Sequence, residues 1–243
     1  MLNEFGPPIL HRHDPAARPR AYDVLFEPLP ASGAPGKIAK PLVVHADVVG
    51  ERVIARAGLI GMAGFWRPDA AAALVGALEG GVSLWEEGKL KVPIACIEAS
   101  HERLGGFEPP AFPVREARLF FRTPLRLRSG DALAQCGASF LIALANRVAR
   151  VAPWQMARLD IDWGMVHEQA RRMDYEMSEL LPYRFTRGTQ RARRRLPVVG
   201  LLGRMTIRGR LGAWTPLLQI GSQVNVGSHA AIGLGRFDLT LLP

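Results

Sequence analysis

Alternation of apolar and polar residues is clearest near the end of the chain. In "RFDLTLL" (residues 236–242) the pattern is typical of a half-buried strand. In "FFRTPLRLRS" (residues 120–129), Leu125 and Leu127 alternate with arginines, so one face of this strand is apolar and the other is basic. Pro124 predicts an edge position or a bulge there. Further strands are predicted in residues 21–29 and 199–210, and residues 42–49 are either a short strand or the start of a helix.

Helical spacing of apolar residues marks three segments. The segment "RPDAAAALVGALEGG" (residues 67–81) predicts a helix with Asp69 as its N-cap and two glycines at its end. A second helix is predicted in "GASFLIALANRVARVAP" (residues 137–153), which ends at a proline. A third is predicted in residues 164–182, and a helix or turn in residues 211–221. The apolar stripe of the third helix consists of Val166, Ala170, Met173, Met177 and Leu180.

The order of these elements predicts the fold class. A Gly/Pro-rich stretch near residues 104–113 resembles a linker. After it, a strand, a helix, strands, a helix and a strand follow within about 120 residues, as in a split βαβ or ferredoxin-like unit. Two such units in tandem fit a chain of 243 residues. We therefore predict an α+β protein with two tandem ferredoxin-like (RRM-like) domains, one in residues 1–110 and the other in residues 111–243.

Composition narrows the class of protein. Hydrophobic residues make up 48% of the chain and charged residues 22%, which suits a folded globular protein. Cys96 and Cys136 are too few for a disulfide framework or a cysteine metal site, and this favours a reducing cytoplasm. No apolar run has the roughly 18–20 residues of a membrane span. The sequence predicts a cytoplasmic protein that needs no cofactor and no metal, and that binds no membrane.

Positive charge is concentrated in one part of the chain. The net charge is +9, and the stretch from Leu180 to Phe237 contains ten Arg and neither Asp nor Glu. Such a segment repels itself unless an anion lies nearby, and arginine suits bidentate contacts to phosphate. Nucleic acid is therefore the leading expected partner. Acidic lipid comes second, because no basic amphipathic helix with a wide apolar face accompanies the charge.

Two blocks of sequence resemble a known family. They are "FFRTPLRLRSGD" (residues 120–131) and "VVGLLGRMTIRGRLGAWTPLLQIGSQVNVGSHAAIGLGRFDL" (residues 198–239). They resemble the C-terminal domain of the CRISPR repeat-processing endoribonucleases, members of the RAMP superfamily with a glycine-rich loop before the last strand. Residues 158–197 look like a larger, Arg-rich insertion. This insertion resembles the helical finger of the type IV members, which stay bound to their processed guide RNA.

The resemblance implies a substrate and a reaction. Two ferredoxin-like domains would grip the repeat stem-loop of precursor crRNA. The RNA would be cut at the 3′ base of the stem by the neighbouring 2′-hydroxyl, without a metal, and the product would stay bound. Subunits of a CRISPR effector complex are further expected partners. The alternative is a non-catalytic subunit that binds the crRNA stem-loop without cutting it.

The resemblance also points to catalytic residues. His45 lies in the first domain where the family usually places its catalytic histidine, although a buried or capping role is equally open. An imidazole can take a proton from a 2′-hydroxyl or give one to the leaving oxygen. Arg20, Tyr22 and Lys40 flank the expected active-site edge and are further candidates, although each could be an ordinary surface or strand residue.

Phosphate contacts are expected in two places. The loop from Gly227 to Gly235 would bring backbone amides to phosphates. Many relatives have a lysine just after the first loop glycine, where this chain has Ser228, so binding is the expected role of the loop and catalysis by His229 is a weaker alternative. The predicted RNA-binding residues are Arg184, Arg187, Arg191, Arg193, Arg194, Arg195, Gly227, Ser228, His229, Gly233, Gly235 and Arg236.

Overall fold

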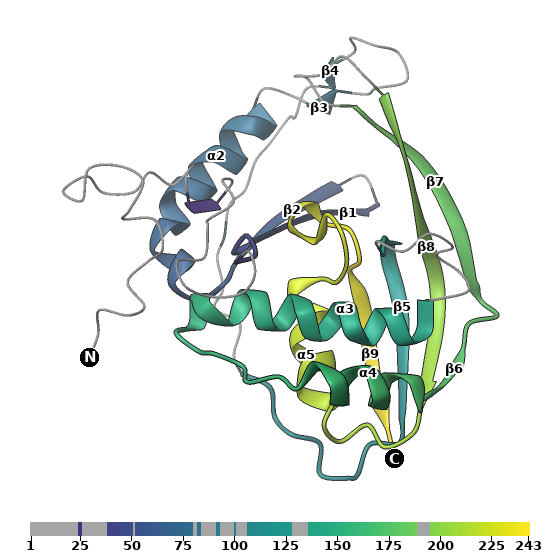
Figure 1. Cartoon of the computed structure of the whole chain (residues 1–243). Coiled ribbons are helices and arrows are strands. Elements are labelled where there is room, and N and C mark those ends of the chain that lie inside the picture. Colours follow the sequence, from purple (N-terminus) through teal and green to yellow (C-terminus); the bar gives the residue numbers. More distant parts are fainter. Residues whose placement is uncertain are drawn as a thin grey trace.

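The computed structural model describes residues 24–25, 38–50, 52–79, 82–83, 91–92, 100, 106–127, 136–188 and 195–243. Its C-terminal part contains a five-stranded antiparallel sheet with helices on one side (Figure 1). The strands are β5 (Glu116–Leu125), β6 (Asp174–Glu176), β7 (Leu180–Gly188), β8 (Arg195–Arg208) and β9 (Phe237–Leu242). The helices are α3 (Cys136–Val151), α4 (Trp163–Arg171) and α5 (Thr215–Val224), with short 3-10 turns at η2 (Ala152–Gln155) and η3 (Ala230–Ile232).

Strand β5 lies in the middle of this sheet, between β8 and β9. Both β6 and β7 pair with β8 on its other edge, one after the other along its length. The pairing of β5 with β8 shifts register between Phe121 and Leu125, so the bulge predicted at Pro124 is confirmed. A bulge bends the end of β5, and this is the end that reaches the site described below.

The core lies between the sheet and α3, α4 and α5. Residues at alternate positions of β5 face this core, and Phe121 packs against Phe140 of α3 and Phe237 of β9 with all three ring centroids 5.7 Å apart. Tilted and edge-on contacts of this kind add to the free energy gained by burial. The opposite face of β5 exposes Arg118, Phe120 and Arg122, because no helix covers that side of the sheet among the described residues.

The N-terminal part is built around the hairpin of β1 (Leu42–Val49) and β2 (Arg52–Leu59). It continues through η1 (Gly61–Trp66) and α2 (Arg67–Glu79) to a short pair of strands, β3 (Val82–Ser83) and β4 (Lys91–Val92). Its core includes Trp154 from the C-terminal part, whose indole N–H donates to the Ala39 carbonyl at 2.8 Å. The two parts therefore share a buried contact.

The predicted α+β class with antiparallel sheets is confirmed, as are the helices expected near residues 67–81 and 137–153 and the last strand. Residues 42–49 form a strand. The division into domains 1–110 and 111–243 stays a prediction. Three details were wrong. Val24 and Leu25 are helical, not extended, and α2 continues directly from η1, so Asp69 lies inside its first turn and is not the N-cap.

The third error concerns the Arg-rich insertion at residues 158–197. The helix expected to run to residue 182 ends at Arg171, and the chain then forms β6 and the β7–β8 pair. Met173, Tyr175 and Met177 all pack against the core, so the apolar period here is two residues. The apolar residues from Val166 to Leu180 are also spaced by three and four positions, and for that reason the pattern resembled a helix. The insertion is therefore largely a β-hairpin and not a helical finger.

Candidate active site

The glycine-rich loop (residues 225–236) lies directly on β1. At Gly233, φ is +95°, and a Cβ atom would lie 2.4 Å from the Val44 carbonyl oxygen and 3.6 Å from the His45 Cα atom. Only glycine fits this backbone conformation and this close approach without strain. The loop is thus brought against the strand that carries His45, although the two are nearly 190 residues apart in the sequence.

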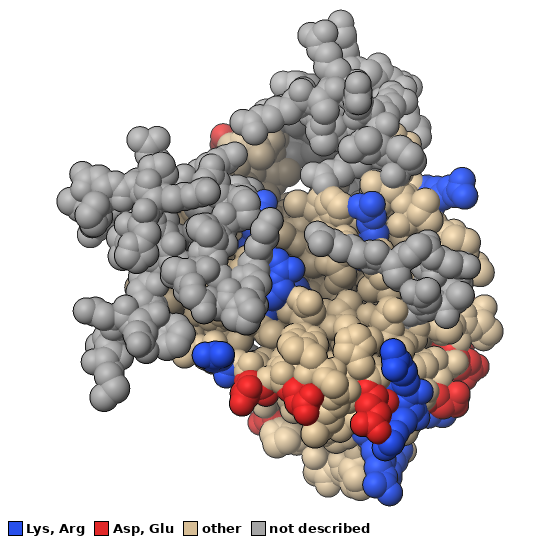
Figure 2. All heavy atoms as spheres, in the orientation of Figure 1, with Lys and Arg blue, Asp and Glu red and all other residues tan. Residues whose placement is uncertain are grey.

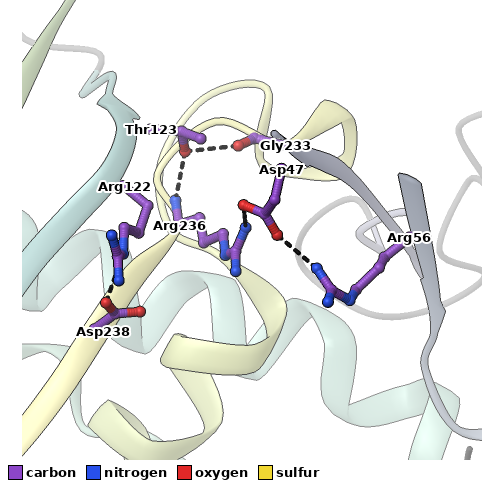
Figure 3. A network of polar contacts seen from close by, with 7 residues as sticks. All are labelled: Asp47, Arg56, Arg122, Thr123, Gly233, Arg236 and Asp238. Carbon is purple, nitrogen blue, oxygen red and sulfur yellow. Dashed lines mark hydrogen bonds and ion pairs between the residues drawn. The ribbon is translucent and has the colours of Figure 1, made fainter. Parts of the chain in front are cut away.

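Hydrogen bonds attach the same loop to the bent end of β5. The hydroxyl of Thr123 donates to the Gly233 carbonyl at 2.7 Å and accepts from the Arg236 amide at 2.9 Å (Figure 3). The amide of Ser228 donates to the Arg126 carbonyl, and that of Gly235 donates to the Pro124 carbonyl. These amides are engaged within the protein. The loop therefore works first as a scaffold that joins β5 to β1.

A pocket of about 320 Å³ opens where these elements meet. The residues that line it come from β1, from the end of β5, from β7 and from the glycine-rich loop. They are His45, Ala46, Thr123, Pro124, Tyr183, Phe185, Ile232, Gly233 and Leu234. His45 is the residue of this set whose side chain titrates near neutral pH. The pocket therefore combines an apolar, aromatic wall with one imidazole.

The surroundings of His45 keep its imidazole neutral. Burial lowers its pKa below the ordinary 6.5, the positive charges of Arg236 and Arg56 lower it further, and the negative charge of Asp47 raises it. Its Nδ1 atom is buried and has no hydrogen-bond partner in the described part of the chain. At neutral pH such a ring is unprotonated, so it can accept a proton from a hydroxyl group in the pocket.

Asp47 joins the N-terminal hairpin to the glycine-rich loop. Its carboxylate accepts from Arg236 at 2.6 Å and from Arg56, the cross-strand partner of His45 on β2, at 2.5 Å (Figure 3). The hydrogen bond from Arg236 is the main reason that the pKa of Asp47 lies below its usual value. Asp47 is two residues after His45 on β1, so both point to the same face of the strand. This ion pair adds a polar link to the contact at Gly233.

The structure brings several of the predicted site residues together. His45 and Gly233 line the pocket. The other loop residues adjoin it, and the Nδ1 atom of His229 lies 3.1 Å from a guanidinium nitrogen of Arg126. Arg184 is exposed on β7. Lys40 precedes β1 next to Ala39, whose amide donates to the Arg150 carbonyl at the end of α3, and Lys40 does not line the pocket.

The remaining predicted residues are placed only in part or not at all. Arg187 and Arg195 belong to the paired ends of β7 and β8. Arg20, Tyr22, Arg191, Arg193 and Arg194 lie outside the described residues.

Sequence reasoning missed Tyr183, Phe185, Asp47 and Arg126. A signal for the first two existed in "YRF" (residues 183–185), where aromatic residues alternate with arginine and so share one face of a strand. The alternation in residues 120–129 marked Arg126 as part of a basic strand face but not as a neighbour of the loop. No local pattern marked Asp47, because its partner Arg236 is distant in the sequence.

Two further searches of the described residues gave negative results. They contain no group of three or more His, Cys, Asp or Glu residues placed to hold a metal ion. None of their helices is long and apolar enough to cross a membrane.

Part of the sequence matches a known protein family. Residues 119–237 match the model of the CRISPR-associated endoribonuclease Cas6 family. The C-terminal part of the chain is similar to the Cas6 family over this stretch. The matched stretch runs from the middle of β5 to the first residue of β9 and so contains the whole glycine-rich loop. The family expected from the sequence is thereby confirmed, while its type IV subgroup stays a prediction.

A solved structure of the same family has a similar fold. It is a Cas6 product complex with 17% identity and a TM-score of 0.54, and the match covers 86% of this chain and 84% of its own. Cas6 of Thermus thermophilus is 15% identical with a TM-score of 0.48, and the match covers 82% of this chain and 79% of its own. A RAMP protein that binds different RNA substrates is 13% identical with a TM-score of 0.46, and the match covers 83% of this chain and 77% of its own. No protein of curated function matches the sequence significantly.

Proposed function

We propose that the protein is an endoribonuclease that cuts the repeat stem-loop of precursor crRNA at its 3′ base and keeps the product bound. The Cas6 family match supports RNA cleavage in a CRISPR context. One observation carries the assignment of the active site. The neutral imidazole of His45 lines a pocket closed on one side by the glycine-rich loop of that family match.

The proposed reaction is an internal transesterification. His45 takes the proton from a 2′-hydroxyl, and the 2′-oxygen attacks the adjacent phosphorus. The bond from phosphorus to the 5′-oxygen breaks, and that oxygen takes a proton from water. The products are a 2′,3′-cyclic phosphate and a 5′-hydroxyl. The nucleophile is part of the substrate, so the reaction needs no metal to activate water.

Affinity for the stem is assigned to the arginines of the β7–β8 hairpin and its surroundings. A double-stranded RNA stem is recognised mostly through phosphates and shape. Arg184 is exposed and forms no ion pair with a described residue, so it is available for a phosphate. We assign the same role to Arg187, Arg191, Arg193, Arg194 and Arg195. Arg126, which contacts His229, adds a second cationic side chain beside the loop.

The remaining predicted residues have less support. Arg20, Tyr22 and Lys40 stay predicted contributors to charge stabilisation at the phosphate. Arg236 already binds Asp47, so its proposed role is to hold the loop against β1 and only secondarily to contact RNA.

The test uses the repeat RNA of the CRISPR array encoded in the same genome. The purified protein is incubated with this RNA in EDTA, and the ends of the products are identified. We expect one cut at the 3′ base of the stem, a 2′,3′-cyclic phosphate, and no cut when the nucleotide on the 5′ side of that bond is 2′-deoxy. Cleavage of the deoxy RNA would exclude the internal nucleophile. Binding without any cleavage would favour the non-catalytic subunit.

A further inference from the structure

We infer that Tyr183 and Phe185 form a stacking site for one unpaired base next to the bond that is cut. The inference rests on the proposed function, since it describes how the same pocket holds its RNA. It assigns a role in positioning and specificity to two residues of β7, and the proton transfer stays with His45.

The two aromatic side chains share one face of β7. They are separated by one residue, so both point to the same side of the strand. Their ring centroids lie 6.1 Å apart with a tilt of 33° between the ring planes. Both rings line the pocket that contains His45. A base that lies on this aromatic wall therefore lies within the same small space as the imidazole.

Strand β8 has no side chain opposite Tyr183, and Pro124 packs into the space. Gly200 is the cross-strand partner of Tyr183 on β8. A Cβ atom at Gly200 would lie 2.7 Å from the Cβ atom of Pro124, so the ring of Pro124 packs where a side chain would otherwise stand. Together with Ile232 and Leu234, Pro124 gives the pocket an apolar lining beside the aromatic rings.

Size and charge indicate what the pocket accepts. Its volume of about 320 Å³ is at the lower end of the range of about 300–1,000 Å³ for small-molecule sites. This space is about the size of a single base. None of the lining residues is acidic, so an RNA strand meets no repulsive carboxylate in the pocket. Arg184, between the two aromatic residues in the sequence, points to the opposite face of β7, where its exposed side chain can meet RNA outside the pocket.

The exposure of Tyr183 fits this role. Its side chain is 47% exposed on a strand whose outer edge pairs with no described strand. A large aromatic residue in such a place adds little to the core, but its face is open to a ligand. Stacking on an aromatic ring works for every base, since each has a π-face. We therefore expect the site to bind a nucleotide outside the paired stem, whatever its base. Binding of this nucleotide would fix the position of the cut.

Binding measurements with modified RNA test the stacking site. The probe is the repeat RNA made uncleavable by a 2′-deoxy nucleotide at the cut, with one nucleotide at a time near the cut replaced by an abasic nucleotide. Tyr183→Ala is expected to weaken binding of the unmodified probe by about 5- to 150-fold. One abasic position should weaken wild-type binding to a similar degree and should not weaken binding of Tyr183→Ala any further.

Two variants separate stacking from other roles. Leu181→Ala changes another exposed residue on the same face of β7, outside the pocket, and should bind like the wild type. Tyr183→Phe keeps the ring and removes the hydroxyl group, so it should restore most of the binding that Tyr183→Ala loses. Equal losses in Tyr183→Phe and Tyr183→Ala would show that the hydroxyl acts, and would overturn the inference.

Failure of this inference can be distinguished from failure of the proposed function. If the wild-type protein does not cut the ribose form of the repeat, the proposed function fails. If it cuts, but no abasic position is coupled to Tyr183, then the pocket holds no stacked base and the inference alone fails.

Discussion

The open face of the five-stranded sheet and the pocket at His45 both carry arginines, but the two regions hold them differently. On the sheet face each arginine meets a carboxylate. Arg208 bonds to Glu116 and Glu176 at 2.8 and 2.7 Å, and Arg122 bonds to Asp238 at 2.6 Å. Arg118 bonds to Glu116, and Arg204 lies 3.5 Å from Glu179.

Around the pocket the arginines are of two kinds, and Arg56 and Arg236 are the paired ones, since both bind Asp47. Arg126 contacts His229, and neither Arg126 nor Arg184 pairs with a carboxylate of the described residues. Figure 2 shows the same contrast on one side of the molecule: acidic and basic side chains lie together over α4 and β6, while the charged side chains coloured over the upper part of β7 and β8 are basic. The comparison teaches that an arginine is available to bind an RNA phosphate only where no carboxylate of the protein already pairs with it.

The largest expected effect is at the pocket. Replacing His45 by Ala should slow single-turnover cleavage of the repeat RNA by about 10²- to 10⁴-fold, the usual contribution of a positioned acid or base. The dissociation constant should change little, because the arginines supply the affinity. His167→Ala on α4, remote from the pocket, is the control. A wild-type rate for His45→Ala would move the chemistry to Arg20, Tyr22 or Lys40.

The second-largest effect on cleavage is expected at the contact between the glycine-rich loop and β1. Gly233→Ala puts a Cβ atom 2.4 Å from the Val44 carbonyl at a φ of +95°, so the loop must move away from His45. A displacement of about 1 Å at a site of this kind can cost about 10²-fold in rate. Cleavage rates and thermal unfolding are measured together. Gly212→Ala, where a Cβ atom has open space, should leave both unchanged, and an equal loss in the two variants would contradict the assignment.

The paired arginines of the sheet face can be compared with the run of arginines in residues 191–195. Changing Arg191, Arg193, Arg194 and Arg195 to Ala should weaken stem-loop binding. The slope of log affinity against log salt should fall by about 0.7–0.9 for each phosphate that these side chains no longer neutralise. The matched variant changes the four paired arginines of the sheet face to Gln and should keep the wild-type slope. If the sheet-face variant also flattens the slope, the carboxylates do not keep these arginines from RNA.

The pH profile of cleavage should show the environment of His45. The base form is required, and its pKa lies below 6.5, so the rate should be constant above that pH and fall as the pH drops through the lowered pKa. A rate that instead falls with rising pH would show that the protonated ring is the active form.

The smallest effect is expected at Asp47. Asp47→Asn removes the charge that raises the pKa of His45 and leaves the two arginines that lower it, so the acid limb should move to still lower pH. The charge of Asp47 affects the pKa of His45 less than burial and the charge of Arg236 do. The shift of the limb should therefore be small. An NMR titration of His45 gives the same shift without catalysis, and a shift to higher pH would contradict the assigned charges.

Much of the C-terminal half was predictable from local pattern. The alternation in residues 237–242 and the helical spacing in residues 137–151 are periods of the backbone itself, and one buried face is enough to reveal them. The segment after α4 was misread because Met173, Tyr175 and Met177 fit a period of two while other apolar residues nearby fit a helix. The choice between them depended on pairing with β8, which no local pattern records.

The sequence by itself determined the family, the glycine spacing of the loop and the excess of arginine between Leu180 and Phe237. Only the tertiary structure decided which of these arginines are neutralised. Arg204, Arg208 and Arg236 pair with carboxylates from outside that stretch, among them Asp47, which lies 189 positions earlier in the chain. The pocket was likewise decided by folding, since it joins β1, β5, β7 and the loop. Ion pairs and pockets depend on distance in space, and distance along the chain carries almost no information about it.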